Sequence, residues 1–232
     1  MPKPSIDLII PAYNEEDSIG RVLADIPSSW VREVIVCNNG STDRTREVAI
    51  AGGATVVDEP ISGYGNACLK GIAHLRAKPI EEQPDIVVFL DGDYSDHPEE
   101  LPNLVKPIIE ENCDLVIGSR ALGDMERGAM MPQQIFGNWL ATTLIRFFYK
   151  YNFTDLGPFR AIKYPKLIEI DMRDRDFGWT VEMQVKAAKY KLKCTEVPVT
   201  YRRRIGVSKV SGTIRGTILA GHKILWTIFK LL

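Results

Sequence analysis

The sequence predicts an α/β fold built on a Rossmann-like, mostly parallel sheet flanked by helices. Short apolar runs alternate with helix-like stretches from the N-terminus to about Gly118, which is typical of βαβ units. The runs are apolar throughout, as expected of parallel strands that are buried on both faces. Polar residues directly follow several runs, at the strand ends where such sheets bind ligands.

The elements of the N-terminal half follow from these patterns in order along the chain. Strands are expected where short apolar runs are bounded by turn residues. These runs cover residues 7–10, 33–37, 54–57, 86–90 and 114–117. Helices are expected where apolar positions recur at helical spacing after a capping residue or a proline. These segments cover residues 15–26, 43–51, 66–77 and 98–111.

The pattern changes after Gly118, where a polar, Met-rich stretch begins. The elements expected beyond it are a helix at 138–151, a turn at 155–160, a helix at 180–190, a strand at 195–201, a basic loop at 202–209 and an amphipathic helix at 210–232. We expect residues 1–209 to form one domain, to which residues 210–232 add a C-terminal amphipathic helix.

Composition and charge exclude several classes of protein. The 232 residues are 45% hydrophobic and 25% charged, which is ordinary for a globular protein. The formal net charge is -1, so the chain lacks the overall basic surface expected of a nucleic-acid-binding protein. The 4 cysteines are scattered without a CxxC pair, which argues against a zinc site or a redox pair.

Neither a signal peptide nor a membrane-spanning segment is expected. Residues 1–10 lack the charged start and apolar core of a signal peptide. A span needs about 20 mostly apolar residues, whereas the most apolar region, 214–232, is interrupted by cationic side chains. We therefore expect a cytoplasmic chain.

Asp91 and Asp93 are candidate metal ligands. They end a predicted buried strand and are separated by a glycine, so both carboxylates can hold a hard cation that also binds phosphate oxygens. Mg²⁺ or Mn²⁺ with a bound diphosphate fits this pattern. The alternative is a turn whose aspartates cap the helix that begins near Pro98.

Four motifs resemble those of family-2 inverting glycosyltransferases, which have the glycosyltransferase A-type fold. They are PAYNE at 11–15, NNGSTD at 38–43, DGD at 91–93 and GSR at 118–120. Three later segments, at 155–160, 178–183 and 202–209, resemble the polyprenyl-phosphate (dolichyl-phosphate) hexose synthases. The resemblance implies transfer of a hexose from UDP-glucose or GDP-mannose to a polyprenyl phosphate, with residues 1–209 as the catalytic domain.

The resemblance also assigns residues to the nucleotide sugar. Pro11, Tyr13 and Glu15 would surround the base and ribose, and Asn38 would reach the edge of the base. The family often has Asp at the position of Asn38. An amide both donates and accepts hydrogen bonds, whereas a carboxylate only accepts them, so the identity of the base stays open.

The remaining implied residues lie around the metal and the phosphates. Asp91 and Asp93 correspond to the metal motif, and Ser95 stands where some relatives have a third ligand, Gln, so we expect a more hydrated ion. Arg120 corresponds to an arginine that faces the reacting phosphates. Its alternative is a surface ion pair.

The basic loop suits an acceptor phosphate and a leaving diphosphate, because guanidinium groups bind phosphate oxygens bidentately. Its cations are Arg202, Arg203, Arg204 and Lys209. One register turns Arg203 toward the site, and the other turns Arg202 and Arg204 toward it, since neighbouring side chains alternate in an extended segment. The alternative is a solvated run of charge.

Two carboxylates are candidates for a general base. Inversion requires in-line attack on the anomeric carbon while metal, Arg and Lys stabilise the leaving diphosphate. A phosphate acceptor has a second pKa of about 6 and needs no base. A hydroxyl acceptor would need one, and Glu182 is the first candidate and Asp155 the second. The alternative for Glu182 is an exposed glutamate in a first helical turn.

The apolar positions of 210–232 and of a second stretch at 140–151 are interspersed with cations, which favours contact with a membrane surface. Packing in the core is the alternative. We expect a peripheral enzyme at the inner face of the membrane, with a separate membrane protein as a further partner. Two other functions stay open, a transferase to a glycan or lipid-linked hydroxyl and a non-catalytic nucleotide-sugar-binding protein.

Overall fold

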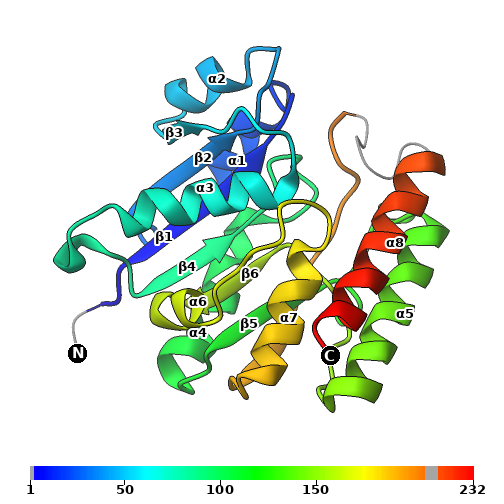
Figure 1. Cartoon of the computed structure of the whole chain (residues 1–232). Coiled ribbons are helices and arrows are strands. Elements are labelled where there is room, and N and C mark those ends of the chain that lie inside the picture. Colours follow the sequence, from blue (N-terminus) through cyan, green and yellow to red (C-terminus); the bar gives the residue numbers. More distant parts are fainter. Residues whose placement is uncertain (1–2, 207–213) are drawn as a thin grey trace.

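The computed structural model describes residues 3–206 and 214–232, with side chains described over 3–206 and 221–232 (Figure 1). Within these residues, seven strands form a single sheet in the order β3-β2-β1-β4-β6-β5-β7. The strands are β1 Ile6–Ala12, β2 Glu33–Asn38, β3 Thr55–Asp58, β4 Ile86–Phe89, β5 Leu115–Ser119, β6 Arg160–Lys163 and β7 Cys194–Pro198. The five strands predicted in the N-terminal half are therefore confirmed.

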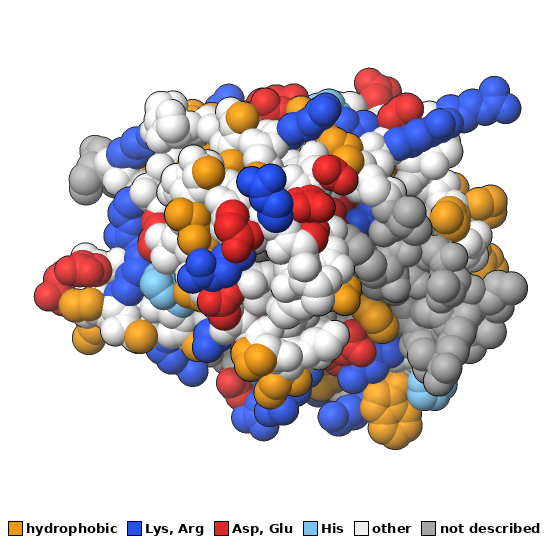
Figure 2. Space-filling model, turned by 90° about the horizontal axis from the view of Figure 1, so that it is seen from above, with side chains coloured by type: hydrophobic (Ala, Val, Ile, Leu, Met, Phe, Trp, Pro, Cys, Tyr) orange, Lys and Arg blue, Asp and Glu red, His pale blue; other side chains and the backbone are white. Residues whose placement is uncertain are grey.

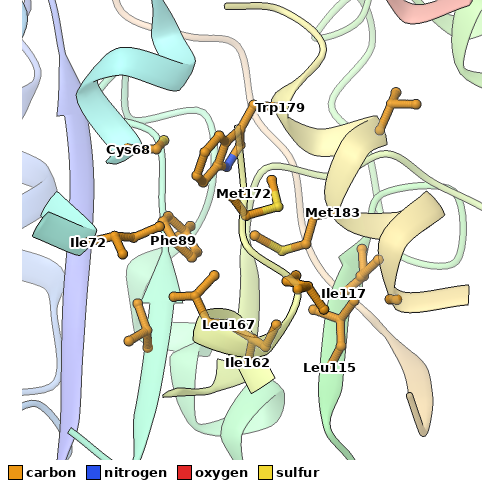
Figure 3. Packing of buried hydrophobic residues seen from close by; sticks show 14 of the residues in the cluster. Cys68, Ile72, Phe89, Leu115, Ile117, Ile162, Leu167, Met172, Trp179 and Met183 are labelled. Atoms are coloured by element: carbon orange, nitrogen blue, oxygen red, sulfur yellow. The ribbon is translucent and has the colours of Figure 1, made fainter. Parts of the chain in front are cut away.

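Helices cover both faces of this sheet. They are α1 Ile19–Asp25, α2 Thr45–Ala51, α3 Tyr64–Arg76, α4 Leu101–Glu110, α5 Pro132–Tyr149, α6 Tyr164–Glu169, α7 Trp179–Lys189 and α8 Ile214–Lys230, with short 3-10 helices at Ile80–Glu82 and Pro98–Glu100. Buried side chains of α1, α2 and α4 form the core on one face, and those of α3, α6 and α7 form the core on the other. Figure 3 shows the second core, where Trp179 packs edge-on against Phe89 with ring centroids 5.8 Å apart.

One strand, β6, was not predicted. It lies antiparallel between β4 and β5, whereas the other strand pairs are parallel. The predicted turn at 155–160 ends in Arg160, which instead begins β6 and is 0% exposed. The Arg160 guanidinium donates to the carbonyl oxygens of Leu156 (2.9 Å) and Thr180 (3.0 Å). Because the strand begins with a charged residue, its apolar run is too short to predict a strand from the sequence.

Helices α5 and α8 stand side by side at the β7 end of the molecule (Figure 1). The Tyr149 hydroxyl of α5 donates to the Ile228 carbonyl oxygen of α8 at 2.6 Å, and Ile228 is fully buried. Several large apolar side chains of the two helices are nevertheless exposed. They include Ile135, Phe136, Trp139, Phe147, Trp226 and Phe229, which together with Leu232 just after α8 we call the apolar face.

Among the residues that the structure describes, no helix has both the length and the apolar character to cross a membrane. The predicted domain boundary at 209/210 lies outside the described residues, so the division into 1–209 and 210–232 stays a prediction.

Candidate active site

A cleft of about 300 Å³ opens at the end of the sheet where β1 and β4 finish. Five of the residues predicted to bind the donor or metal line it, namely Pro11, Tyr13, Glu15, Asp91 and Asp93, together with Arg204 from the basic loop. Figure 2 shows the molecule from the side on which α2 lies in Figure 1, and acidic and basic side chains lie close together near the centre of that view. We call this cavity the donor cleft.

The carboxylates of Asp91 and Asp93 both face the donor cleft. The Tyr64 hydroxyl donates to Asp91 at 2.9 Å, and the Ser95 hydroxyl donates to Asp93 at 2.6 Å. Burial and the neighbouring charge of Asp93 raise the pKa of Asp91 to about 7. A divalent cation stabilises the charged form of two carboxylates that lie close together in a buried site.

Within the described part of the chain, no group of three or more His, Cys, Asp or Glu side chains is placed to hold a metal ion. Mg²⁺ is usually bound in proteins by one or two carboxylates together with substrate phosphates and water. The pair Asp91 and Asp93 therefore fits a cation that arrives with a diphosphate, and it does not fit a cation enclosed by protein ligands alone.

Arg204 is the arginine of the basic loop that faces the donor cleft. Its guanidinium lies 3.1 Å from Asp93 Oδ2 and 3.0 Å from Glu15 Oε1. The backbone explains this register, because the N–H groups of Arg202 and Ile205 donate to the carbonyl oxygens of Ser95 and Asp93. The loop is thereby laid along the segment that carries the carboxylate pair.

The other two arginines lie elsewhere. Arg202 stacks 3.3 Å from the centre of the Tyr94 ring and donates to the Tyr94 carbonyl oxygen at 2.7 Å. Arg203 is 63% exposed and donates to the carbonyl oxygen of Arg127. Arg202, which is predicted to contact phosphates, does not line the donor cleft, because its guanidinium donates to backbone carbonyl oxygens outside it. Its contact with phosphates stays a prediction. Lys209 lies outside the described residues.

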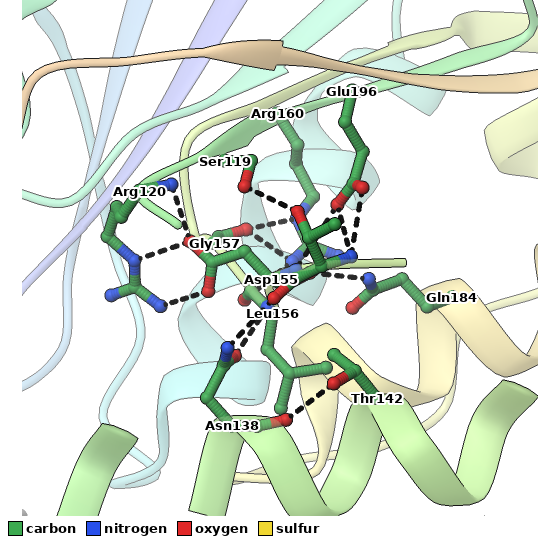
Figure 4. A network of polar contacts seen from close by, with 11 residues as sticks. Ser119, Arg120, Asn138, Thr142, Asp155, Leu156, Gly157, Arg160, Gln184 and Glu196 are labelled. Atoms are coloured by element: carbon green, nitrogen blue, oxygen red, sulfur yellow. Dashed lines mark hydrogen bonds and ion pairs between the residues drawn. The ribbon is translucent and has the colours of Figure 1, made fainter. Parts of the chain in front are cut away.

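Arg120 follows β5 and is held by a buried ion pair (Figure 4). Its Nε and Nη2 lie 2.8 and 2.7 Å from the two carboxylate oxygens of Asp155. Burial opposes both charges, but Asp155 raises the pKa of Arg120, and Arg120 lowers that of Asp155. The pair is interior rather than the surface pair weighed as the alternative, because Asp155 is only 1% exposed.

Arg120 lines a second cavity of about 320 Å³ that adjoins the donor cleft. Tyr64, Asp91, Asp93, Phe177 and Arg204 line both cavities. The second cavity extends to α5, which contributes Gln133, Gln134, Gly137 and Asn138, and to α8, which contributes Gly221 and Ile224. Met130 and Leu156 line it between these helices and the arginines. We call it the helix cavity.

Residues 7–170 match the family described as Glycosyl transferase family 2. The chain belongs to glycosyltransferase family 2. An uncharacterized glycosyltransferase of Mycobacterium tuberculosis is 33% identical over 218 residues, which are 93% of this chain and 94% of that protein. The undecaprenyl-phosphate mannosyltransferase of Micrococcus luteus is 31% identical over 225 residues, which are 90% of this chain and 88% of that protein.

The fold is similar to a crystal structure of glucosyl-3-phosphoglycerate synthase from Mycobacterium tuberculosis in complex with Mn²⁺, UDP-glucose and phosphoglyceric acid. The TM-score is 0.76 at 24% sequence identity, over 98% of this chain and 79% of that one. The predicted glycosyltransferase A-type fold is thus confirmed. As a member of family 2, the protein is a glycosyltransferase that takes its sugar from a nucleotide sugar.

Asn38 of this glycosyltransferase does not line the donor cleft. It lies opposite Asp58 in the β2–β3 register, and its side-chain amide donates to the Asp58 carboxylate at 2.8 Å. This hydrogen bond is the main cause of the lowered pKa of Asp58. The neighbour Asn39 lines the cleft instead, and its side-chain oxygen accepts the Gly63 N–H at 2.8 Å. The structure thus places Asn39 rather than Asn38 in the lining of the cleft, and contact of Asn38 with the base stays a prediction.

Glu182 lines neither the donor cleft nor the helix cavity. It is 4% exposed, and its carboxylate accepts the backbone N–H groups of Arg173 and Asp174. This placement differs from both sequence-based readings, a base at the reacting groups and an exposed helix glutamate.

Several residues that line the donor cleft were not predicted as site residues from the sequence, among them Asn39, Tyr64, Asp176 and Phe177. Tyr64 belongs to a segment, GYGN at 63–66, that the sequence offered only as a weak phosphate loop. Asp176 and Phe177 lie in the loop between α6 and α7, which has no motif of its own. Only the packing of this loop against α3 brings the two residues into the lining of the cleft.

Proposed function

We propose that this glycosyltransferase transfers a hexose from a UDP- or GDP-sugar to the phosphate of a polyprenyl phosphate, with Mg²⁺ or Mn²⁺ held by Asp91 and Asp93. The helix cavity carries the proposal. It contains Arg120 and Arg204 at the carboxylate pair. Beyond them it is lined by the apolar side chains of Met130, Leu156, Trp179 and Ile224, with Gln133, Gln134 and Asn138 of α5 beside them. An acceptor with an anionic head group and an apolar chain matches a cavity with arginines at one end and apolar side chains beyond them.

The donor cleft supplies the surfaces for the nucleotide sugar. Pro11 at the end of β1 and Tyr13 and Glu15 directly after it line the cleft, where we propose that the base and ribose lie. The diphosphate would reach Asp91 and Asp93 together with the cation, which supplies positive charge next to the leaving group when bound. The undecaprenyl-phosphate mannosyltransferase among the relatives supports a lipid phosphate as acceptor.

In the reaction, a phosphate oxygen of the acceptor forms a bond to the anomeric carbon as the bond from that carbon to the diphosphate oxygen breaks. The nucleoside diphosphate leaves with the electron pair, and the anomeric configuration inverts. Arg204 and Arg120 are positioned to stabilise the charge that develops on the phosphates.

The hydrogen bonds that the two candidate bases already accept favour a phosphate acceptor over a hydroxyl acceptor. Asp155 is bound by the Arg120 guanidinium, and Glu182 is bound by backbone N–H groups. A hydroxyl acceptor needs a base with an oxygen free to take the proton. A phosphate monoester is mostly dianionic at neutral pH, since its second pKa is about 6.

Transfer of labelled hexose tests the proposal. The protein is incubated with Mn²⁺ and UDP-glucose, UDP-galactose or GDP-mannose, and with either a short polyprenyl phosphate or the corresponding polyprenol. We expect acid-labile lipid-linked hexose with one donor and only with the phosphate. Transfer to hydroxyl acceptors alone would overturn the phosphate acceptor, and metal-dependent nucleotide binding without any transfer would favour a non-catalytic role.

The apolar face supports binding to the membrane surface that holds such a lipid. Phe147 is 65% exposed and Trp139 is 58% exposed, and cationic side chains such as Arg146, Lys150 and Lys230 lie on the same two helices. Apolar side chains next to cations are typical of helices that lie in the interface of an anionic membrane. We propose a peripheral enzyme of the inner face, for which a separate membrane protein is a further partner.

Replacing Trp139 and Phe147 by Ser is expected to weaken binding to vesicles that contain anionic lipid by about 100-fold or more, because each buried aromatic contributes about 1.5–3 kcal/mol and about 1.4 kcal/mol is tenfold. Co-sedimentation with phosphatidylglycerol vesicles measures the effect. Ile80→Ser is the matched control, since Ile80 is 85% exposed but lies outside α5 and α8. Equal binding by all variants would remove the membrane role of the apolar face.

A further inference from the structure

The loop at residues 171–178 forms one wall of the donor cleft. Asp176 and Phe177 line the cleft, and Phe177 also lines the helix cavity. The loop lies directly on the start of α3, where the Asn66 N–H donates to the Arg175 carbonyl oxygen at 3.0 Å. A Cβ at Gly65 would lie 2.1 Å from the Asp174 carbonyl oxygen. The loop at residues 171–178 and the start of α3 are therefore in direct backbone contact.

Glu182 holds the other side of this loop. Its carboxylate oxygens accept the Arg173 N–H at 3.0 and 3.1 Å and the Asp174 N–H at 2.7 Å, and Lys186 Nζ lies 2.8 Å from Oε1. The carboxylate is therefore fully engaged by the loop and by its own helix. To act as a base in the cleft it would have to give up these bonds.

Asp174 extends the same chain of contacts to α8. Its Oδ1 accepts the N–H groups of Asp176 and Gly178, and Lys223 Nζ lies 3.0 Å from its Oδ2. A Cβ at Gly178 would lie 2.5 Å from the Thr227 hydroxyl oxygen of α8. The wall of the donor cleft is consequently tied to the helix that carries part of the apolar face.

We propose that Glu182 is a positioning residue: it fixes the loop at 171–178 and thereby sets where Asp176 and Phe177 meet the nucleotide sugar. This role rests on the donor cleft being the nucleotide-sugar site, as in the proposed function. It explains why a buried carboxylate stands in the first turn of α7 without reaching either cavity. Charged acceptors form stronger hydrogen bonds to N–H groups than neutral ones, so the carboxylate suits the task better than an amide.

Glu182→Gln tests this role. The amide oxygen still accepts one N–H, but the amide NH₂ opposes the second N–H and Lys186. We expect the KM for the nucleotide sugar to rise about 10- to 100-fold, as for other misplaced binding groups. We expect kcat to fall less, with an unchanged pH profile. Asp174→Asn is expected to act in the same direction, and Glu169→Gln, an exposed glutamate on α6, is the matched control.

Two readouts make the result independent of the acceptor. Amide hydrogen exchange should speed up at residues 171–178 in Glu182→Gln while β1 and β4 stay protected. Calorimetry with Mn²⁺ and UDP-glucose or GDP-mannose should show weaker binding. Loss of kcat by about 10³-fold with loss of one limb of the pH profile would instead identify a base, and unchanged loop exchange would overturn the positioning role. If the wild type transfers no hexose to a lipid phosphate, the proposed acceptor is wrong. Amide hydrogen exchange at residues 171–178 still decides whether Glu182 fixes the loop.

Discussion

Asp93→Asn is expected to lower hexose transfer by about 10³-fold, which corresponds to about 4 kcal/mol of transition-state stabilisation. The substitution keeps the shape of the side chain but removes the charge that faces the donor cleft. Its carboxylate oxygens are held in place by Ser95 and Arg204, so a neutral amide loses both the attraction for a divalent cation and that for the guanidinium. Excess Mn²⁺ should restore only a small part of the activity.

The measurement is kcat/KM for transfer across a series of Mn²⁺ concentrations. Asp17→Asn is the control, because it removes the same charge from an exposed position, and it should transfer hexose at the wild-type rate. An Asp93→Asn variant that keeps near-normal kcat/KM at every Mn²⁺ concentration would exclude a catalytic cation at this carboxylate pair.

Arg204→Ala is expected to lower transfer by about 10²- to 10³-fold, because a charged hydrogen-bond donor to the developing phosphate charge is lost. The same variant should bind Mn²⁺ more tightly when no nucleotide is present. In the structure the Arg204 guanidinium occupies Asp93 Oδ2 and Glu15 Oε1, so its removal frees an oxygen ligand and removes a repelling positive charge. Arg204→Lys should recover part of the transfer, since the charge returns without the planar fork.

Electron paramagnetic resonance of free Mn²⁺ gives the metal affinity, and the lipid-linked hexose assay gives transfer. Arg203→Ala is the neighbouring control, because that side chain is 63% exposed and its contacts lie outside the cleft. Large loss of transfer in Arg203→Ala together with normal transfer in Arg204→Ala would show that the basic loop adopts the opposite register during the reaction.

Much of the donor cleft was predictable because it is built from segments that directly follow buried strands. Pro11, Tyr13, Glu15, Asp91 and Asp93 lie at or just after the ends of β1 and β4, and these parallel neighbours end at the same edge of the sheet. The position of a residue at the end of a strand does not fix the partner of its side chain. Asn38 follows the same rule of position, yet it turns to Asp58 because that carboxylate lies opposite it in β3.

The α/β class, the strands of the N-terminal half and the carboxylate pair were predictable from the sequence, because apolar periodicity and the residues after each strand are local features of short segments. Which arginine faces inward and what Glu182 binds follow from tertiary packing. Arg204 meets Glu15 across a separation of 189 positions, and Glu182 is engaged by backbone groups of a loop without a motif. Such contacts depend on how distant segments pack, and residue type does not encode the direction in which a side chain points.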